Sequence, residues 1–186
     1  VNGGDTGGEA DVGPPVLPQF GWDGEVSYTL VLGEPWVYEP TDLEFDPQDP
    51  TRLWVTSRAD DAFVTLDLMD GDTGVPSKFV DYYHTYADSV SSLAFSDNNT
   101  FASCQESMNT FNGAWEGDGK AGASLWPADL DSFSNGGGVT PGGPLIDNLN
   151  GSALCMGIAW RGDHAFYLFD GEHGDLKLFD FKRPSV

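Results

Sequence analysis

The sequence contains few basic residues and only two cysteines. Eight Lys and Arg residues stand against 30 Asp and Glu residues, which gives a net charge of −22 at pH 7. A surface of that charge repels the phosphates of nucleic acids and the headgroups of anionic lipids. The composition therefore argues against nucleic acid as a partner. It is consistent with binding to cations or basic protein surfaces, and equally with a charge that only keeps the protein soluble.

Long apolar runs and long helix-compatible stretches are missing as well. No run approaches the ~18 apolar residues of a membrane-spanning helix. The 186 residues include 24 glycines and 12 prolines, which interrupt the chain too often for long helices. Hydrophobic residues make up 39% and aromatic residues 13%, which is enough to form a core. We therefore expect short strands joined by turns, with no membrane span.

The cysteines and two Asn-containing triplets indicate an oxidising compartment. Cys104 and Cys155 form an even pair, and a metal site would require more soft ligands, so we expect a disulfide between them. Asn98 and Asn150 each begin an Asn-x-Ser/Thr triplet, the acceptor pattern for N-glycosylation. These features predict a secreted or otherwise extracytoplasmic protein.

The first 19 residues differ in composition from the rest of the chain. They are rich in Gly, Asp and Pro and contain little to bury, so ordering them would cost backbone entropy without hydrophobic compensation. We expect residues 1–19 to be a flexible segment. From Phe20, the stretch "FGWDGEVSYTLVL" alternates and then becomes aliphatic, which predicts that the folded region covers residues 20–186.

Three later segments can be aligned with one another. They read "DLEFDPQDPTRLWVTSRADDAFVTLDL" from Asp42, "SLAFSDNNTFASCQESMNTFNGAW" from Ser92 and "GIAWRGDHAFYLFDGEHGDLKLFDF" from Gly157. In each, an apolar-x-aromatic strand meets a polar turn, a second strand, a polar corner and a third strand. The third strands are expected around Phe63, Phe111 and Leu176. The spacing is typical of β-propeller blades with loop insertions.

The aligned segments resemble the NHL/YVTN family of β-propeller repeats. "DLEFDP", "RLWVTS" and "FVTLDL" match the typical blade pattern of that family. The resemblance implies an all-β, partial β-propeller of about three four-stranded blades, with repeats near residues 41–80, 90–130 and 153–181. It is specific for the fold and says little about chemistry.

Three blades are half of a six-bladed ring and leave two sheet edges open. We therefore expect the chain to be one piece of a longer polypeptide or to be completed by a partner chain. On this basis it would act as an extracytoplasmic binding or scaffold module with a protein partner. The alternative is part of a metal-dependent propeller lyase or hydrolase, whose other ligands lie outside this chain.

A Gly-rich insertion, residues 116–152, separates the second and third repeats. Loops of this length are usually functional or mobile. Trp115 directly precedes the insertion and Trp126 lies in its first part, and we identify both as candidate ligand contacts. Packing between blades is the competing role for both rings.

The corner of the third repeat carries four candidate metal ligands. Asp170, Glu172 and Asp175 have the oxygen donors that calcium prefers, and His173 could instead contribute to a transition-metal site. A solvated polar turn is the third interpretation, because neither spacing is diagnostic. The Arg161–Asp163 tripeptide, Arg-Gly-Asp, falls at the turn between the first two strands of this repeat, where Gly and Asp serve the backbone.

The sequence offers little support for catalysis. It has no Gly-x-Ser-x-Gly motif, and the order of Ser, His and Asp singles out no triad. Cys104 is followed by Gln105 and Glu106, whereas a nucleophilic thiolate needs electropositive surroundings. A role as an enzyme is therefore less expected than a role in binding.

Overall fold

The computed structural model describes residues 29–68, 74–83, 86–106, 122–146, 154–171 and 173–182. All of its sheets lie within Val31–Val186, which forms one compact unit separate from Val1–Leu30. Several predictions fall on residues outside the described ranges: the flexible segment 1–19, Phe111, Trp115, Asn150 and Glu172.

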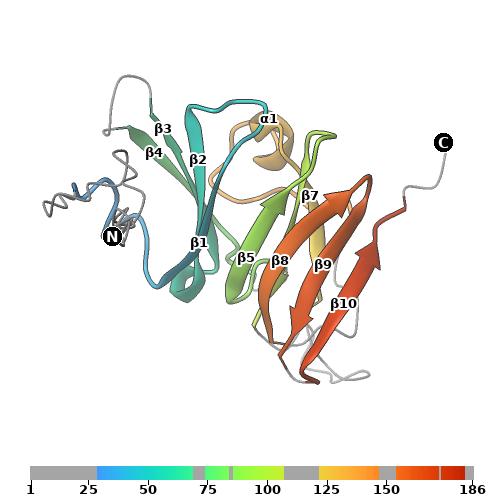
Figure 1. The fold of residues 1–186 in the computed structure, drawn as a ribbon. Helices are drawn as coiled ribbons and strands as arrows, with labels where there is room; N and C mark the ends of the chain where they lie inside the picture. Colours follow the sequence, from blue (N-terminus) through green and yellow to red (C-terminus); the bar gives the residue numbers. More distant parts are fainter. Residues whose placement is uncertain are drawn as a thin grey trace, which may run out of the picture. The chain divides into compact units, whose positions relative to one another are not determined.

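The fold is all-β and consists of three antiparallel sheets that follow one another along the chain (Figure 1). The first sheet contains β1 (Pro40–Phe45), β2 (Arg52–Ser57), β3 (Ala62–Asp67) and β4 (Val75–Val80), in that order. The second contains β5 (Val90–Phe95), β6 (Thr100–Gln105) and β7 (Ser124–Pro127). The third contains β8 (Cys155–Gly162), β9 (Ala165–Asp170) and β10 (Asp175–Asp180). Two short helices complete the described elements, η2 (Arg58–Asp60) and α1 (Leu130–Phe133).

The sheets are arranged like neighbouring blades of a propeller. The first strand of each sheet lies beside that of the next, so that β5 lies between β1 and β8 (Figure 1). The later strands of each sheet extend away from this row. The expected all-β, partial propeller-like architecture is therefore confirmed, with four strands in the first sheet and three described strands in each of the others.

The third strand of the second sheet does not lie where the repeat alignment put it. β6 pairs with β7, and the register places Phe101 opposite Trp126. Both rings are fully buried, so pairing here buries two large aromatic side chains. The strand and the following helix α1, which buries Phe133, come from the predicted Gly-rich insertion. This part of the insertion thus completes the second sheet.

The turn between β8 and β9 is formed where the sequence predicted it. β8 ends at Gly162, and Asp163 has a φ of 50°. Gly162 has a φ of 135°, which L side chains rarely adopt, so glycine suits this position. The Arg-Gly-Asp tripeptide is therefore part of a hairpin turn.

Two hydrophobic clusters hold the three sheets together. The one between the first and second sheets is mainly aromatic and includes Trp54, Phe63, Phe79, Phe95, Phe101, Trp126 and Phe133. The one between the second and third sheets contains smaller residues as well and includes Ala94, Ala102, Cys104, Ala123, Leu125, Cys155, Phe166 and Leu168. In the part of the chain that the structure describes, no helix is both long and apolar enough to cross a membrane.

Candidate functional site

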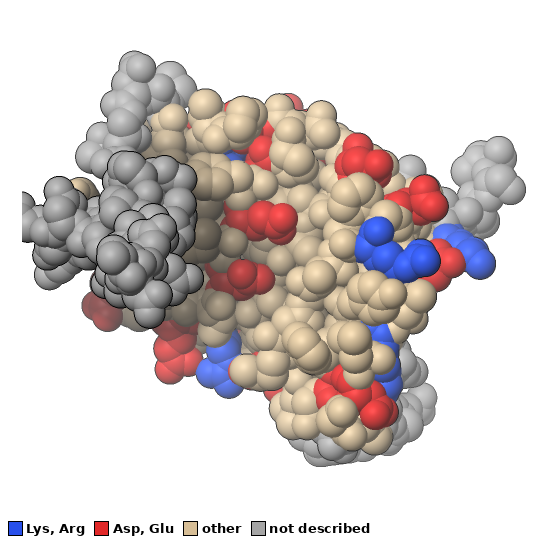
Figure 2. All heavy atoms as spheres, viewed as in Figure 1, with Lys and Arg blue, Asp and Glu red and all other residues tan. Residues whose placement is uncertain are grey.

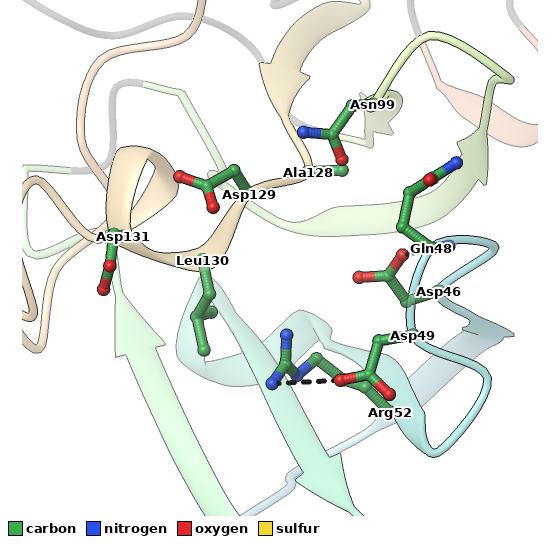
Figure 3. A pocket seen from close by; sticks show the side chains of 9 residues that line it. All are labelled: Asp46, Gln48, Asp49, Arg52, Asn99, Ala128, Asp129, Leu130 and Asp131. Carbon is green, nitrogen blue, oxygen red and sulfur yellow. Dashed lines mark hydrogen bonds and ion pairs between the residues drawn. The ribbon is translucent and has the colours of Figure 1, made fainter.

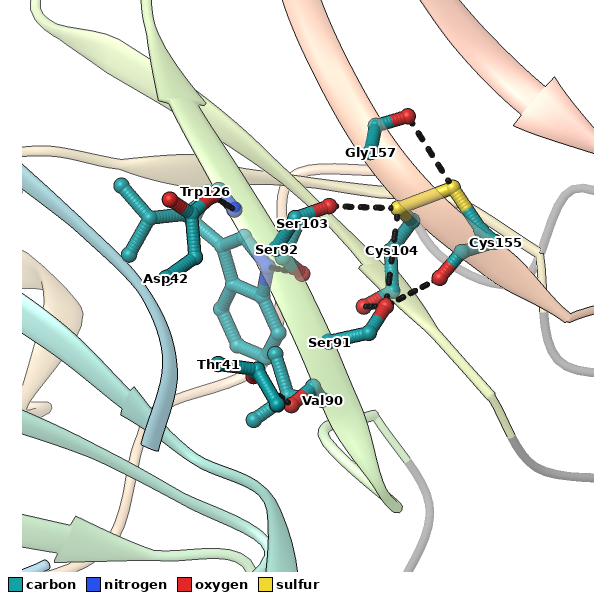
Figure 4. Close-up of a disulfide and its surroundings, with 11 residues drawn as sticks. Thr41, Asp42, Val90, Ser91, Ser92, Ser103, Cys104, Trp126, Cys155 and Gly157 are labelled. Carbon is teal, nitrogen blue, oxygen red and sulfur yellow. Dashed lines mark hydrogen bonds between the residues drawn. A yellow bond between two sulfur atoms is a disulfide. The ribbon is translucent and has the colours of Figure 1, made fainter. Parts of the chain in front are cut away.

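The two cysteines form the predicted disulfide, and it connects the second and third sheets (Figure 4). Cys104 lies on β6 and Cys155 at the start of β8, with their Cα atoms 5.5 Å apart. Both residues are fully buried. The hydroxyl of Ser91 on β5 donates to the carbonyl oxygen of Cys155, and the same hydroxyl lies 3.1 Å from the carbonyl oxygen of Cys104. The bridge is therefore a structural element of the core.

The predicted metal corner is built around a buried ion pair. The side chain of Asp170 is fully buried and accepts hydrogen bonds from Lys177 Nζ, from the backbone N–H of His173 at 3.0 Å and from its ring Nδ1 at 2.9 Å. Burial alone would raise the pKa of Asp170. The hydrogen bonds from Lys177 and His173 outweigh it and hold this pKa well below its usual value.

Asp175 is the other candidate oxygen ligand of this corner that the structure describes. Asp175 is exposed at the start of β10, on the strand that pairs with β9 opposite Asp170. Among the described residues, no three His, Cys, Asp or Glu side chains group so that they could hold a metal ion. The carboxylate oxygens of Asp170 are already used by a lysine and a histidine, so the described part of the corner is organised as an ion pair.

Two other predicted site residues are placed clearly. Trp126 is fully buried between the first two sheets, and its Nε1 donates to Ser103 Oγ at 2.8 Å. A ring in this position packs the core and offers no face to a ligand at the surface. Asn98 is exposed in the turn between β5 and β6, and its Nδ2 lies 2.8 Å from Nδ1 of His164 in the third sheet.

An acidic hollow of ≈ 590 Å³ lies beside the turn between β1 and β2 (Figure 3). Its carboxylates belong to Asp46, Asp49, Asp129 and Asp131. Arg52 pairs with Asp49 at 3.3 Å and with Asp67 at 2.7 Å, which partly neutralises the hollow. A hydrogen bond from Thr51 lowers the pKa of Asp49, and hydrogen bonds from Ser132 lower the pKa of Asp129. The lowered pKa values keep Asp49 and Asp129 ionised under mildly acidic conditions.

A second hollow, of ≈ 470 Å³, runs along the row of first strands and is lined by residues of β1, β5 and β8. On its wall, Asp42 accepts the backbone N–H of Leu93 at 2.9 Å, and Glu44 accepts that of Phe95 at 3.0 Å. The carboxylates of β1 thus satisfy donors on the edge of β5. Burial raises the pKa of Glu44, and nearby Asp42 raises it further, although the Phe95 N–H opposes both.

The outer side of the third sheet carries an uncovered apolar surface. Tyr167 and Phe169 on β9 are 38% and 58% exposed, and Leu176 and Leu178 on β10 are 61% and 50% exposed. The register pairs Leu176 with Phe169 and Leu178 with Tyr167, so the four side chains lie on one side of the sheet. We call these four residues the open face. Figure 2, seen from the same side as Figure 1, shows Lys, Arg, Asp and Glu side chains among uncharged ones over β8, β9 and β10.

The corresponding sides of the other two sheets are covered. Trp54, Ala102 and Tyr167 occupy the same register position, because they pair with the matching residues Glu44, Ala94 and Ala159. Trp54 packs against the second sheet and Ala102 against the third, and both are fully buried. The open face therefore corresponds to the side of the first sheet that packs against the second sheet, and to the side of the second sheet that packs against the third.

The opposite end of the row is partly covered by the chain itself. Val55 and Val64, on the outer side of the first sheet, are buried by Val37 from the segment before β1. On the same side, Leu43 and Phe45 stay 60% and 50% exposed. The two ends of the row are thus unequal: Val37 covers part of this side, whereas the four side chains of the open face are 38% to 61% exposed.

Sequence reasoning did not single out the open face. A signal for it exists in "AFYLFD", in which Phe166 and Leu168 face the core while Tyr167 and Phe169 face outward. A strand that is apolar on both sides is typical of a sheet covered on both sides.

Comparisons with known proteins support the fold and leave the family open. No family model and no curated protein matches the chain. A structure described as "Crystal structure of Nidogen/Laminin Complex", which contains a β-propeller, is similar over 76% of this chain and 43% of that chain, with 14% sequence identity and a TM-score of 0.50. "Structure of U3-55K" is similar over 80% of this chain and 41% of that chain, with 12% identity and a TM-score of 0.45. The chain thus spans less than half the length of either. The NHL/YVTN resemblance stays a prediction.

Proposed function

We propose that this chain is an extracytoplasmic binding or scaffold module, and that its third sheet receives a further β-sheet supplied by a partner or by additional polypeptide. The open face is the observation that carries this proposal. Contiguous exposed apolar patches commonly mark interaction sites on soluble proteins. Here the patch occupies the register position that forms a sheet-to-sheet contact twice elsewhere in the molecule.

The chemistry of the open face suits a dry sheet-to-sheet contact. Two aromatic and two leucine side chains form cross-strand pairs. Complete burial of a side chain of this size contributes about 1.5 to 3 kcal/mol. Gly157 lies under the ring of Phe169, where an added Cβ would come within 3.0 Å of the ring. The absence of a side chain at Gly157 therefore leaves room for the ring of Phe169 beside β8.

The extracytoplasmic location rests on the disulfide and the charge. A buried disulfide between two sheets persists in oxidising compartments and is rare in the cytosol. A net charge of −22 keeps such a module soluble and favours partners with basic surfaces.

The test is the mass of the protein purified under native conditions from a secreting host. We expect the wild-type chain in an assembly heavier than the 20.0 kDa of one chain. Phe169→Glu together with Leu178→Glu places two charges on the open face and should return the mass to that of one chain. Val75→Glu is the matched control, because Val75 on β4 is 73% exposed and lies on a different sheet.

Light scattering gives the mass, and circular dichroism verifies that each variant is folded. A wild-type protein with the mass of a single chain at every concentration would contradict the proposal. Equal dissociation by Val75→Glu would contradict it as well, because the effect would then be unspecific.

A further inference from the structure

The first sheet carries an uncovered apolar surface that has a buried equivalent on the second sheet. Leu43 and Phe45 on β1 are 60% and 50% exposed. The strand registers give Leu93 and Phe95 on β5 the same positions in their sheet. These two side chains are buried in the cluster between the first and second sheets. We call Leu43 and Phe45 the matching face.

The first two sheets show how an open face and a matching face fit together. The ring of Trp54 in the first sheet packs edge-on against Phe95 in the second, with the ring centroids 5.9 Å apart. Tyr167 in the open face has the register position of Trp54, and Phe45 in the matching face has that of Phe95. The chain therefore exposes, at its two ends, both halves of a contact that it buries between its first two sheets.

We propose that a second copy of this chain is the partner, and that the open face of one copy packs on the matching face of the other. The proposal rests on the proposed function, because it names the source of the sheet that the third sheet receives. A second copy fits because this chain itself carries the surface that the open face lacks. In the pair, Tyr167 of one copy packs against Phe45 of the partner subunit, and the row of sheets continues from one copy into the next.

The strands keep charged side chains away from this contact. Side chains alternate along a strand, so Asp42 and Glu44 point to the side of β1 opposite the matching face. Their carboxylates accept backbone N–H groups of β5. Lys177 on β10 likewise points away from the open face and bonds to the buried Asp170. Both faces therefore present uncharged side chains, although the chain as a whole is strongly acidic.

The number of sheets limits the number of copies. Propellers close with ~4 to 8 blades. One chain has three sheets among its described residues, so two copies supply six and three copies supply nine. A head-to-tail contact between identical chains closes into a ring where the rotation permits. We therefore expect a closed pair of two chains with two identical contacts.

Charge repulsion between the copies opposes this pairing and provides a diagnostic. Each copy carries a net charge of −22. Salt shortens the range of such repulsion, from about 10 Å at 0.1 M to about 3 Å at 1 M. Pairing of two copies through apolar faces therefore strengthens as salt is added. Binding of a basic partner weakens instead, because salt screens the attraction.

The test is light scattering of the purified full chain and of two charge variants. The open-face variant is Phe169→Glu with Leu178→Glu, and the matching-face variant is Leu43→Glu with Phe45→Glu. We expect the wild type at twice the 20.0 kDa of one chain and each variant alone at the mass of one chain. An equimolar mixture of the two variants should regain the mass of two chains, because one intact face of each kind remains.

Two controls accompany the variants. Val75→Glu should leave the wild-type mass unchanged, because Val75 on β4 is 73% exposed and belongs to neither face. Circular dichroism verifies that each variant is folded. In addition, raising the salt concentration from about 0.1 M to 1 M should shift the wild-type equilibrium toward the pair.

The variants also define the results that overturn the proposal. A wild-type chain with the mass of one chain at every concentration does so. Pairing of the matching-face variant by itself does so as well, because it means that the open face packs on a copy of itself. A mixture of the two variants that stays at the mass of one chain excludes the head-to-tail contact.

Mass spectrometry of the native assembly under denaturing conditions separates this proposal from the proposed function. An assembly that depends on the open face and contains a different chain overturns the second copy as the partner and leaves the proposed function standing. An assembly of this chain alone that dissociates in both charge variants supports both. A single-chain mass in the native preparation contradicts both.

Discussion

The two junctions between neighbouring sheets are stabilised by different kinds of contact. At the first junction, between β1–β4 and β5–β7, large rings pack together: Phe63 meets Phe101 edge to face, and Trp54 meets Phe101 at a tilted angle. At the second, between β5–β7 and β8–β10, the second sheet contributes small residues such as Ala94 and Ala102, and a disulfide joins the sheets. Where the side chains are small, a covalent bond supplies the connection that ring packing supplies elsewhere.

Removing a ring from the first junction should have the largest effect. Trp54→Ala should lower the free energy of unfolding by about 3 to 5 kcal/mol, because it leaves a large cavity in the aromatic cluster. The milder Trp54→Phe and Trp126→Phe sharpen the test. Trp126 Nε1 donates to Ser103 Oγ, whereas Trp54 Nε1 is buried with no acceptor among the described atoms. Chemical denaturation should therefore show the greater loss for Trp126→Phe.

A greater loss for Trp54→Phe would contradict the assigned hydrogen bonding. It would mean that the indole nitrogen of Trp54, and not that of Trp126, contributes a bond to the first junction.

Opening the disulfide should affect the second junction selectively. The bridge spans 51 residues of sequence, and in the chain-entropy model a loop of that length corresponds to about 4 kcal/mol. Measured values are often lower, so we expect a loss of about 2 to 4 kcal/mol for the Cys104→Ala, Cys155→Ala double variant. Hydrogen exchange followed by mass spectrometry should show lost protection in β8–β10 and retained protection in β2 and β3.

Uniform loss of protection over all three sheets would contradict the comparison. It would show that the sheets unfold as one cooperative unit and that the two junctions do not act separately.

The row of sheets could be predicted from the sequence because each strand carries a local signal. Alternation around Leu43 and Phe45, and the aromatic second strand around Phe166, depend only on neighbouring residues. The sequence places the third strand of the second sheet around Phe111, whereas the strand that pairs with β6 is β7. Sequence spacing alone does not distinguish Phe111 from Trp126 as the aromatic residue opposite β6. The structure chooses Trp126, through a pairing that depends on the second sheet as a whole.

The candidate site was harder to predict for a similar reason. Whether Asp170 binds a metal or an ammonium group depends on strand register, which brings Lys177 of β10 to it across the hairpin. The open face could not be predicted either, because its exposure depends on the third sheet being the last sheet among the described residues. Only the disulfide could be predicted from composition, since two cysteines allow a single pairing.

The smallest expected effect concerns the carboxylate that connects β1 to β5 at the first junction. Burial raises the pKa of Glu44 above its ordinary value of 4.5. The folded state therefore binds a proton more readily than the unfolded state, and this contribution to stability is complete below pH 4.5 and lost as the pH rises through the raised pKa. Glu44→Gln keeps an acceptor for the Phe95 N–H and removes the titration. Relative to wild type, the variant should gain stability as the pH rises, by less than about 1 kcal/mol.

Asp170→Asn is the matched contrast because the pKa of Asp170 is shifted the other way. The contribution of Asp170 is present above its ordinary pKa of 3.8 and lost as the pH falls, so its variant should show the greater deficit at neutral pH. Thermal unfolding of both variants from about pH 2 to pH 7 measures the two slopes, that of Asp170→Asn below the ordinary pKa of 3.8 and that of Glu44→Gln above the ordinary pKa of 4.5. If burial controls the pKa of Glu44, the two slopes have opposite signs. Slopes of equal sign would mean that Glu44 is stabilised as a carboxylate by the Phe95 N–H, and that hydrogen bonding rather than burial controls the first junction at this point.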